Sequence, residues 1–307
     1  MSGRLIVTSL AIAALRIAPA AQTAPLFEFH SNAWLNLHHF ARLSARPGGP
    51  ASTDLSEADA TAWAAGVEFY KRYASRDLLF DATLRDIKTA LRRAEGHANL
   101  EGIGLDADLS ATLERLMPIY QKRWWTEHDR ANREWIASVQ PLLARHGAAL
   151  SSAIARAYET TWPGTPVPVD LCVTAGVNGA YTTGPTHVTI SSSDPSYRGL
   201  HALEMLFHEA SHGVDALLEQ VGRAADEQQV KVPPQLWHAV LFYTAGELTT
   251  RELKAHGLEY QEYASPGLYT NLCGAGCRDR IVQHWQPFLD GRRPREQSLS
   301  ALVASFK

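Results

Sequence analysis

The sequence predicts a mainly helical α+β fold with one small antiparallel sheet. Apolar residues recur with helical periodicity through most of the first half of the chain. Two short segments of β-branched, alternating character follow at 169–174 and 186–191, and the proline-rich stretch 162–168 separates them from the helical half. Helical runs return after these segments, so the expected order is helices, sheet and helices.

Helices are expected on both sides of the sheet. The first has a capped start near residue 27 and continues toward residue 43, and a flexible loop follows at 46–54. Other helices before the sheet are expected at 56–74, 78–95, 107–116, 118–145 and 148–158. After the sheet, helices are expected at 205–214, 236–253, 278–288 and 296–306.

The amino terminus has the three parts of a secretory signal peptide. A short polar start precedes the apolar run 5–15, and small residues at 18–21 offer a cleavage site. That apolar run is too short to span a bilayer. We therefore expect a signal peptide at 1–21, a secreted or periplasmic location, and no membrane insertion of the remaining chain.

The rest of the chain is long enough for a full core. Without the leader it has about 285 residues, which suits one large domain or two joined lobes. We expect a helical lobe at 22–165 and a second lobe at 166–307, integrated in one domain. The formal net charge is −3 and basic residues are scattered, so no nucleic-acid partner is expected.

Three cysteines, Cys172, Cys273 and Cys277, are too few for a disulfide framework. In an exported protein one bridge is possible. Its simplest form joins Cys273 to Cys277 across three small residues, and a bridge from either of these to Cys172 is the alternative.

The sequence His-Glu-x-x-His at 208–212 carries most of the functional information. On a helix, His208 and His212 lie on one face, where both imidazoles can bind one Zn²⁺ while Glu209 stands beside the metal as a base. The flanking residues are apolar, as expected for a buried helix with one polar face.

A di-iron centre is the first rival interpretation. Residues 209–212 also match Glu-x-x-His, which is half of a di-iron site in four-helix bundles. Such a site needs a second Glu-x-x-His, and Glu204, Glu219, Glu247 and Glu252 do not supply one. The sequence therefore disfavours di-iron chemistry.

With this motif, the chain resembles the zincins, the zinc metallopeptidases that share His-Glu-x-x-His, over about residues 169–256. The resemblance implies a zincin-like catalytic lobe at 166–307, a Zn²⁺ cofactor, Glu209 as general base and a peptide or protein substrate. Asp215 and Leu218 stand where the metzincin branch has a glycine and a third histidine. Another zinc hydrolase, acting on a non-peptide amide or ester, and a catalytically silent zinc-stabilised binding protein are the alternatives.

A catalytic zinc usually takes three protein ligands, and the segment 236–253 offers two candidates for the third. His238 and Glu247 are nine residues apart, so on a helix they face opposite ways and only one can reach the metal. Glu247 is preferred because an unpaired carboxylate in this uncharged stretch would be costly. His238 is the second choice and Glu252 a weaker one, and Glu247 could instead pair with Arg251.

A glutamate on a second helix is similar to the gluzincin branch of the zincins. In zincins the strand before the motif helix is a sheet edge that pairs with extended substrate, and residues 180–192 occupy the corresponding place. Asp215 or Glu204 could orient a ligand imidazole. A Tyr or His would stabilise the oxyanion, and the candidates, which the sequence does not separate, are Tyr243, Tyr181, His187, Tyr260, Tyr263 and Tyr269.

Overall fold

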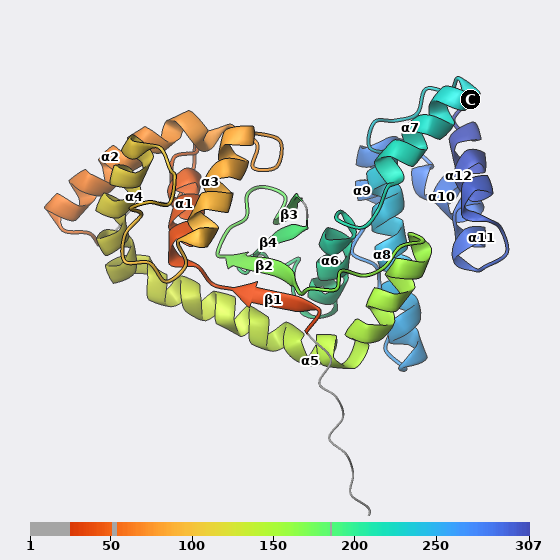
Figure 1. The fold of residues 1–307 in the computed structure, drawn as a ribbon, viewed down its shortest axis with the longest axis horizontal. Helices are drawn as coiled ribbons and strands as arrows, with labels where there is room; N and C mark the ends of the chain where they lie inside the picture. Colours follow the sequence, from red (N-terminus) through yellow and green to blue (C-terminus); the bar gives the residue numbers. More distant parts are fainter. Residues whose placement is uncertain (1–24, 51–53, 185) are drawn as a thin grey trace, which may run out of the picture.

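A computed structural model describes residues 25–50, 54–184 and 186–307. It is mainly helical with one small four-stranded sheet, which confirms the expected α+β class (Figure 1). The expected signal peptide at 1–21 lies outside the described residues. Within the described ranges no helix is both long and apolar enough to cross a membrane.

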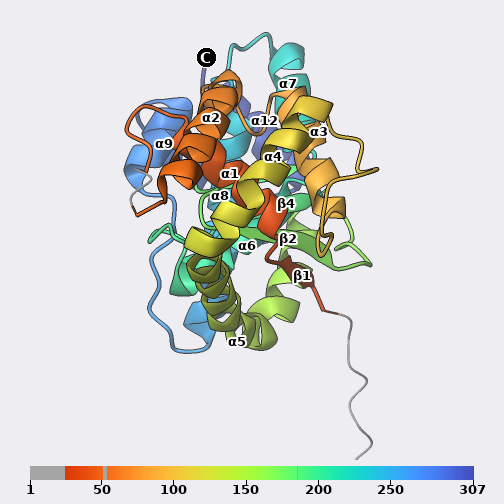
Figure 2. The same cartoon turned by 90° about the vertical axis from the view of Figure 1, so that its left-hand side faces the viewer.

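Four helices form a lobe on one side of the sheet. They are α1 (Ala33–Ser44), α2 (Glu57–Ala74), α3 (Ala82–Arg93) and α4 (Ala107–Tyr120), and Figure 2 shows them in front of the sheet. Each begins at a residue whose side chain accepts a backbone N–H of the first turn: Asn32, Ser56, Asp81 and Asp106. These caps explain why the helices start where they do.

The segment before α1 differs from the expectation. Residues 27–30 form a strand, β1 (Phe27–His30), rather than the first turn of a helix. The Asn32 side chain accepts hydrogen bonds from the N–H groups of Trp34 and Leu35, so the helix starts only after it. Phe27 and Phe29 are spaced two apart, which is the period of a strand and not of a helical face.

One continuous helix, from α4 into α5, joins the lobe of α1 to α4 to the rest of the molecule. Helix α4 continues through a π-helical turn at Gln121–Trp125 into α5 (Thr126–Ala157). Three separate helices were expected at 107–116, 118–145 and 148–158. The two prolines do not end this helix, which is packed on both sides of the π-helical turn: Leu113 and Leu116 are fully buried in α4, and Trp135, Leu150 and Ile154 in α5.

The buried hydrophobic residues form two clusters, and along the helix from α4 to α5 the division between them falls near residue 125. Buried residues of α1 to α4 form one cluster with Cys172 and Tyr181 of the sheet, whereas those of α5 belong to a second cluster with most of the sheet and the later helices. Helix α5 thus packs with residues of the predicted second lobe, and the division into lobes at 22–165 and 166–307 stays a prediction.

The sheet has the strand order β1-β2-β4-β3. Strands β1, β2 (Val167–Cys172) and β4 (His187–Ser191) are parallel, and only β3 (Ala180–Thr183) runs antiparallel to its neighbour β4. The antiparallel sheet that the sequence predicted is thus wrong for most strand pairs. The two β-branched segments pair in parallel because β3 lies between them in the sequence and forms the hairpin with β4.

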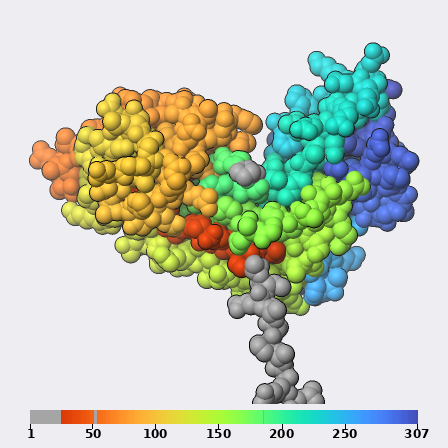
Figure 3. Space-filling view, in the orientation of Figure 1, coloured from red at the N-terminus to blue at the C-terminus, as the bar shows by residue number. Residues whose placement is uncertain are grey.

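The remaining helices follow the sheet. They are α6 (Gly199–Ser211), α7 (Leu217–Gln228), α8 (Leu236–Ala255), α9 (Pro266–Cys273), α10 (Cys277–His284), α11 (Gln286–Leu289) and α12 (Arg295–Ala304). A disulfide between Cys273 and Cys277 links α9 to α10, the simplest of the expected pairings, and Cys172 is a buried free thiol. In Figure 3 the surface has a notch between the lobe of α1 to α4 and helix α7, and residues of the sheet region lie at its base.

Candidate metal centre

The motif residues lie at the carboxyl end of α6. His208 and Glu209 are in its last turn and His212 is the residue that caps it, so the two histidine rings lie on one side of the helix with their centroids 5.1 Å apart. Residues 202–211 of this helix are all buried. The motif is therefore held on a rigid, fully packed helix.

Helix α8 brings a third histidine to this pair. His238 lies in the first turn of α8, which packs against α6, and its Nε2 atom is 3.3 Å from Nε2 of His208. One ligand nitrogen from each of His208, His212 and His238 lies within 4.8 Å of the other two. His208 is buried, whereas His212 and His238 are half-buried, so the cluster faces solvent on one side.

This cluster fits a zinc ion. Two nitrogens bound tetrahedrally to one zinc at about 2.0–2.1 Å are about 3.3 Å apart, which is the separation of the His208 and His238 Nε2 atoms. Three protein ligands are also the number found in catalytic zinc sites, where a fourth position stays open to water or substrate. The cluster thus has both the nitrogen separation and the number of protein ligands that a catalytic zinc site needs.

The protonation state of the histidines suits metal binding as well. Burial lowers the pKa of His208 well below its usual 6.5, with the neighbouring His212 and His238 adding to the shift. Burial also lowers the pKa of His212 to about 3 and that of His238 to about 4. All three imidazoles are therefore neutral at pH 7, and the neutral imidazole is the form that binds metals.

Glu209 is held beside the cluster by the edge strand β3. The side chain of Glu209 is buried, and its Oε2 atom accepts a hydrogen bond of 2.7 Å from the Thr182 hydroxyl. Burial raises the pKa of Glu209 to about 7, although the Thr182 hydrogen bond and the Lys88 charge oppose the shift. A carboxyl group with a near-neutral pKa can both accept and donate a proton at physiological pH.

Two aromatic residues of α8 pack on the histidine rings. Phe242, one turn after His238, stacks on His208 with a centroid distance of 3.8 Å, and Trp237 lies over His238 at 5.0 Å. These rings fix the imidazole orientations and keep water from one side of the cluster. Neither aromatic residue belongs to a motif in the sequence, although Phe242 follows His238 at the helical spacing of four.

Glu247 lies away from the cluster, which corrects the preferred third ligand. Its Oε1 atom accepts hydrogen bonds from Arg251 at 2.7 Å and from Gln286 of α11 at 3.0 Å. Arg251 in turn bonds Asp290. The stretch around Glu247 holds no other charge, but Arg251 one turn later and a distant helix supply the partners. His238 and Glu247 lie on opposite sides of α8, as their spacing of nine residues predicted, and only His238 lies at the motif.

Two of the expected oxyanion donors are buried elsewhere. The Nε2 atom of His187 lies 2.5 Å from a carboxylate oxygen of Asp170 inside the sheet. The Tyr181 hydroxyl lies 3.2 Å from Nε2 of His39, and its ring packs against the Lys88 ammonium at 4.5 Å. The Tyr181 side chain thus connects the sheet to the helical lobe, whereas the His187 side chain pairs within the sheet.

The third expected donor, Tyr243, also points away. Its hydroxyl donates to Gln286 on α11, on the side of α8 that carries Glu247. Tyr260 and Tyr269 donate to Glu204 and Glu262. These hydroxyl groups already have carboxylate or amide acceptors.

Tyr263 packs on the aromatic residue that covers His208, and it is hydrogen-bonded to a second tyrosine, Tyr197. The Tyr263 ring stacks on Phe242, which itself covers His208, and the Tyr263 hydroxyl donates to the Tyr197 hydroxyl at 3.3 Å. Burial, Tyr263 and the charge of Glu209 all raise the pKa of Tyr197. Tyr263 was one of six candidates in the sequence, whereas Tyr197 lies outside every recognisable motif.

The carboxylates expected to orient the ligands have other partners. Glu204 accepts hydrogen bonds from the Tyr260 hydroxyl and from the Tyr263 N–H, and Asp215 accepts the N–H of Leu217 at the start of α7. Burial raises the pKa of Glu204 to about 7 and that of Asp215 to about 6. The Nδ1 atom of His208 has no hydrogen-bond partner among the described residues.

The third side chain of the cluster is therefore a histidine from a separate helix, and the glutamate that indicated the gluzincin branch is not part of the cluster. No protein-family model, curated protein or solved structure matches this chain.

Proposed function

We propose that this protein is an exported zinc metallopeptidase in which His208, His212 and His238 hold Zn²⁺ and Glu209 is the general base. The observation that carries the proposal is the convergence of His238 on the His-Glu-x-x-His helix at a nitrogen separation suited to one zinc. The leader sequence at 1–21 supports export. The motif helix α6 follows a small sheet whose edge strand β3 contacts Glu209, which supports the same interpretation.

The metal and Glu209 divide the chemistry between them. When bound, Zn²⁺ would polarise a carbonyl group and lower the pKa of a water molecule. Glu209 takes the proton from the attacking water and passes it to the leaving amine, a role for which its pKa of about 7 is suited. Thr182 holds the Glu209 carboxylate in place through their hydrogen bond.

Strand β3 is suited to hold a peptide. It is an edge of the described sheet, bonded to β4 on one side only, and its Thr182 contacts the general base directly. An extended peptide adds to such an edge through main-chain hydrogen bonds, which demand little of its side chains. A peptide bound there passes Glu209, so the edge strand favours a peptide over a small ester or amide.

Tyr263 is our candidate for stabilising the oxyanion. Its ring is half-buried and stacks on Phe242, the residue whose ring covers His208. Tyr197 accepts its hydrogen bond in the present arrangement, and a modest rotation of the phenol would free the donor for a substrate oxygen.

The test is a comparison of zinc content and peptide hydrolysis in three proteins: wild type, Glu209→Gln and Glu219→Gln. Glu219 is an exposed residue of α7, so its substitution is the matched control. All three should bind zinc, and cleavage of a diverse peptide library should fall by about 10²–10⁴-fold in Glu209→Gln alone. Equal cleavage by wild type and Glu209→Gln, with zinc bound to both, would refute the peptidase.

A further inference from the structure

A second group of metal-binding side chains lies at the other end of α8. His146 of α5 meets Glu252 of the last turn of α8 and His256, which caps that helix. The Oε1 atom of Glu252 is 3.0 Å from Nδ1 of His146 and 3.2 Å from Nδ1 of His256. The ligand atoms of the three residues all lie within 4.8 Å of one another.

The distances and burial in this group resemble those of a metal site. Ligand atoms bound tetrahedrally to zinc at about 2.0–2.1 Å are about 3.3 Å apart, close to both separations from the Glu252 oxygen. His146 is fully buried, and its Nε2 atom has no hydrogen-bond partner in the described part of the chain. Glu252 is mostly buried as well, with 15% of its side chain exposed, whereas His256 reaches the surface.

This group is separate from the first centre. The two groups share no residue. Glu252 lies fourteen positions after His238 in α8, which at 1.5 Å per residue places them about 21 Å apart along the helix. One ion cannot serve both groups. Neither the general base nor the edge strand is near the second one in the fold.

We propose that His146, Glu252 and His256 form a second binding site for a divalent transition metal, with a preference for Zn²⁺. Two imidazoles and one carboxylate are a ligand set that zinc uses. A metal here would link α5 to the carboxyl end of α8 and so fix the helix that presents His238.

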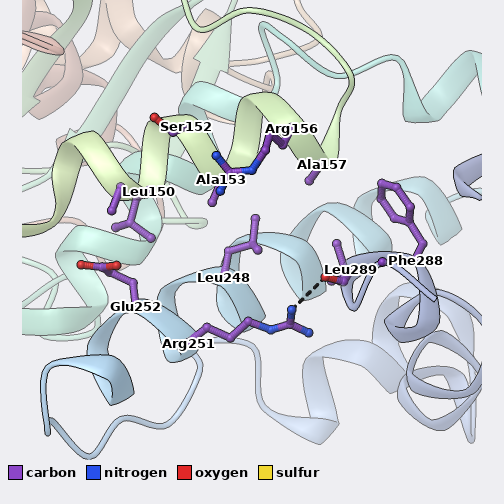
Figure 4. Close-up of a pocket in the computed structure, with 12 residues that line it drawn as sticks. Leu150, Ser152, Ala153, Arg156, Ala157, Leu248, Arg251, Glu252, Phe288 and Leu289 are labelled. Atoms are coloured by element: carbon purple, nitrogen blue, oxygen red, sulfur yellow. Dashed lines mark hydrogen bonds between the residues drawn. The ribbon is translucent and has the colours of Figure 1, made fainter. Parts of the chain in front are cut away.

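The site would keep one coordination position open, because the chain supplies three ligands. Glu252 also lines a pocket of about 580 Å³ between α5, α8 and the segment around α11. Figure 4 shows Glu252 at one end of this pocket beside Leu150, with Arg156 and Phe288 toward the other end. Water or a small ligand could reach the metal from the pocket or from the surface at His256.

The experiment is a titration of the metal-free full-length protein with Zn²⁺, followed by calorimetry and by direct metal analysis. Wild type should bind two equivalents, and His256→Ala and Glu252→Gln should each bind one. His256 is exposed, so its substitution leaves the packing of the helices intact. The control His97→Ala removes an exposed histidine of the helical lobe and should still bind two equivalents.

A second readout separates this site from the first. In His208→Ala, Zn²⁺ should still raise the melting temperature, because a ligand that binds only the folded state stabilises it, and adding His256→Ala should abolish that rise. Two equivalents bound by His256→Ala, or a single equivalent in wild type that disappears in His238→Ala, would overturn the second site. The latter result would leave the first centre intact.

Discussion

Nε2 of His208 and Nε2 of His238 lie 3.3 Å apart although the two histidines belong to different helices. At this distance one neutral imidazole can donate its Nε2–H to the other, and with both protons on Nδ1 the two Nε2 lone pairs can bind one cation. Burial keeps the pKa of both side chains below the physiological range, so neither carries a charge of its own. The packing of α6 on α8 thus brings two neutral imidazole nitrogens from different helices together.

Removing the Tyr263 hydroxyl should slow catalysis without releasing the metal. Tyr263→Phe keeps the ring that stacks on Phe242 but loses the proposed oxyanion donor. We expect kcat to fall by about 10²-fold with KM and zinc content near those of wild type. Tyr243→Phe is the control, because the Tyr243 hydroxyl donates to Gln286. The assignment fails if both phenylalanine variants have wild-type kcat.

Substituting Gly213 should disturb the metal centre through packing alone. A Cβ atom at Gly213, the residue after His212, would lie 1.7 Å from the Thr186 hydroxyl oxygen and 2.5 Å from its Cβ. Gly213→Ala must displace the hairpin or the motif, so we expect a loss of about 1–3 kcal/mol in the free energy of unfolding and weaker zinc binding.

Gly222 offers the matched control for that substitution. It lies within α7, and nothing lies within 4 Å of a Cβ atom built there. Gly222→Ala should therefore stabilise the protein by about 0.5–1 kcal/mol and leave zinc affinity unchanged. Equal effects of the two alanines on stability and on zinc affinity would show that Gly213 does not position His212. Chemical denaturation and zinc competition assays measure both quantities.

Glu204 should make the stability depend on pH in a specific window. Burial raises its pKa from the ordinary 4.5 to about 7, so between these values the folded state holds a proton that the unfolded state has lost. The free energy of unfolding should then fall as pH rises from 4.5 to 7, by up to about 3 kcal/mol from this residue.

Glu204→Gln removes that titration, because the amide cannot ionise but its oxygen can still accept from Tyr260 and Tyr263. Compared with wild type, the variant should lose less stability between pH 5 and pH 8, as measured by urea unfolding. Glu219→Gln, which changes an exposed carboxylate, should follow wild type. Parallel pH profiles for Glu204→Gln and wild type would contradict the account.

The elements of this fold with strong local signals could be predicted from the sequence. Ser56 before a periodic run predicts a helix at 56–74, and α2 begins one residue after that cap. The parallel sheet could not be predicted in the same way, because the direction of β2 relative to β1 depends on the path of the helices between them, including the long helix from α4 to α5. Alternation alone shows which face of a strand is buried, not which strand is its neighbour.

His208 and His212 could be recognised in the sequence because their spacing of four is local. The third residue of the cluster depends on how two helices pack against each other. Periodicity established that only one of His238 and Glu247 could reach the motif. The choice between them failed because the partner of Glu247 from α11 is distant in sequence. Trp237 and Phe242 show the same limit, since their role depends on the position of His208 in space.

The central claim is that His238 completes a zinc site with His208 and His212. Diffraction data collected on both sides of the zinc absorption edge, from crystals of the zinc-loaded full-length protein, test it most directly. The account predicts an anomalous peak bonded to all three histidines at about 2.0–2.1 Å. A peak bonded to Glu247 in place of His238, or no zinc between His208 and His212, would contradict it.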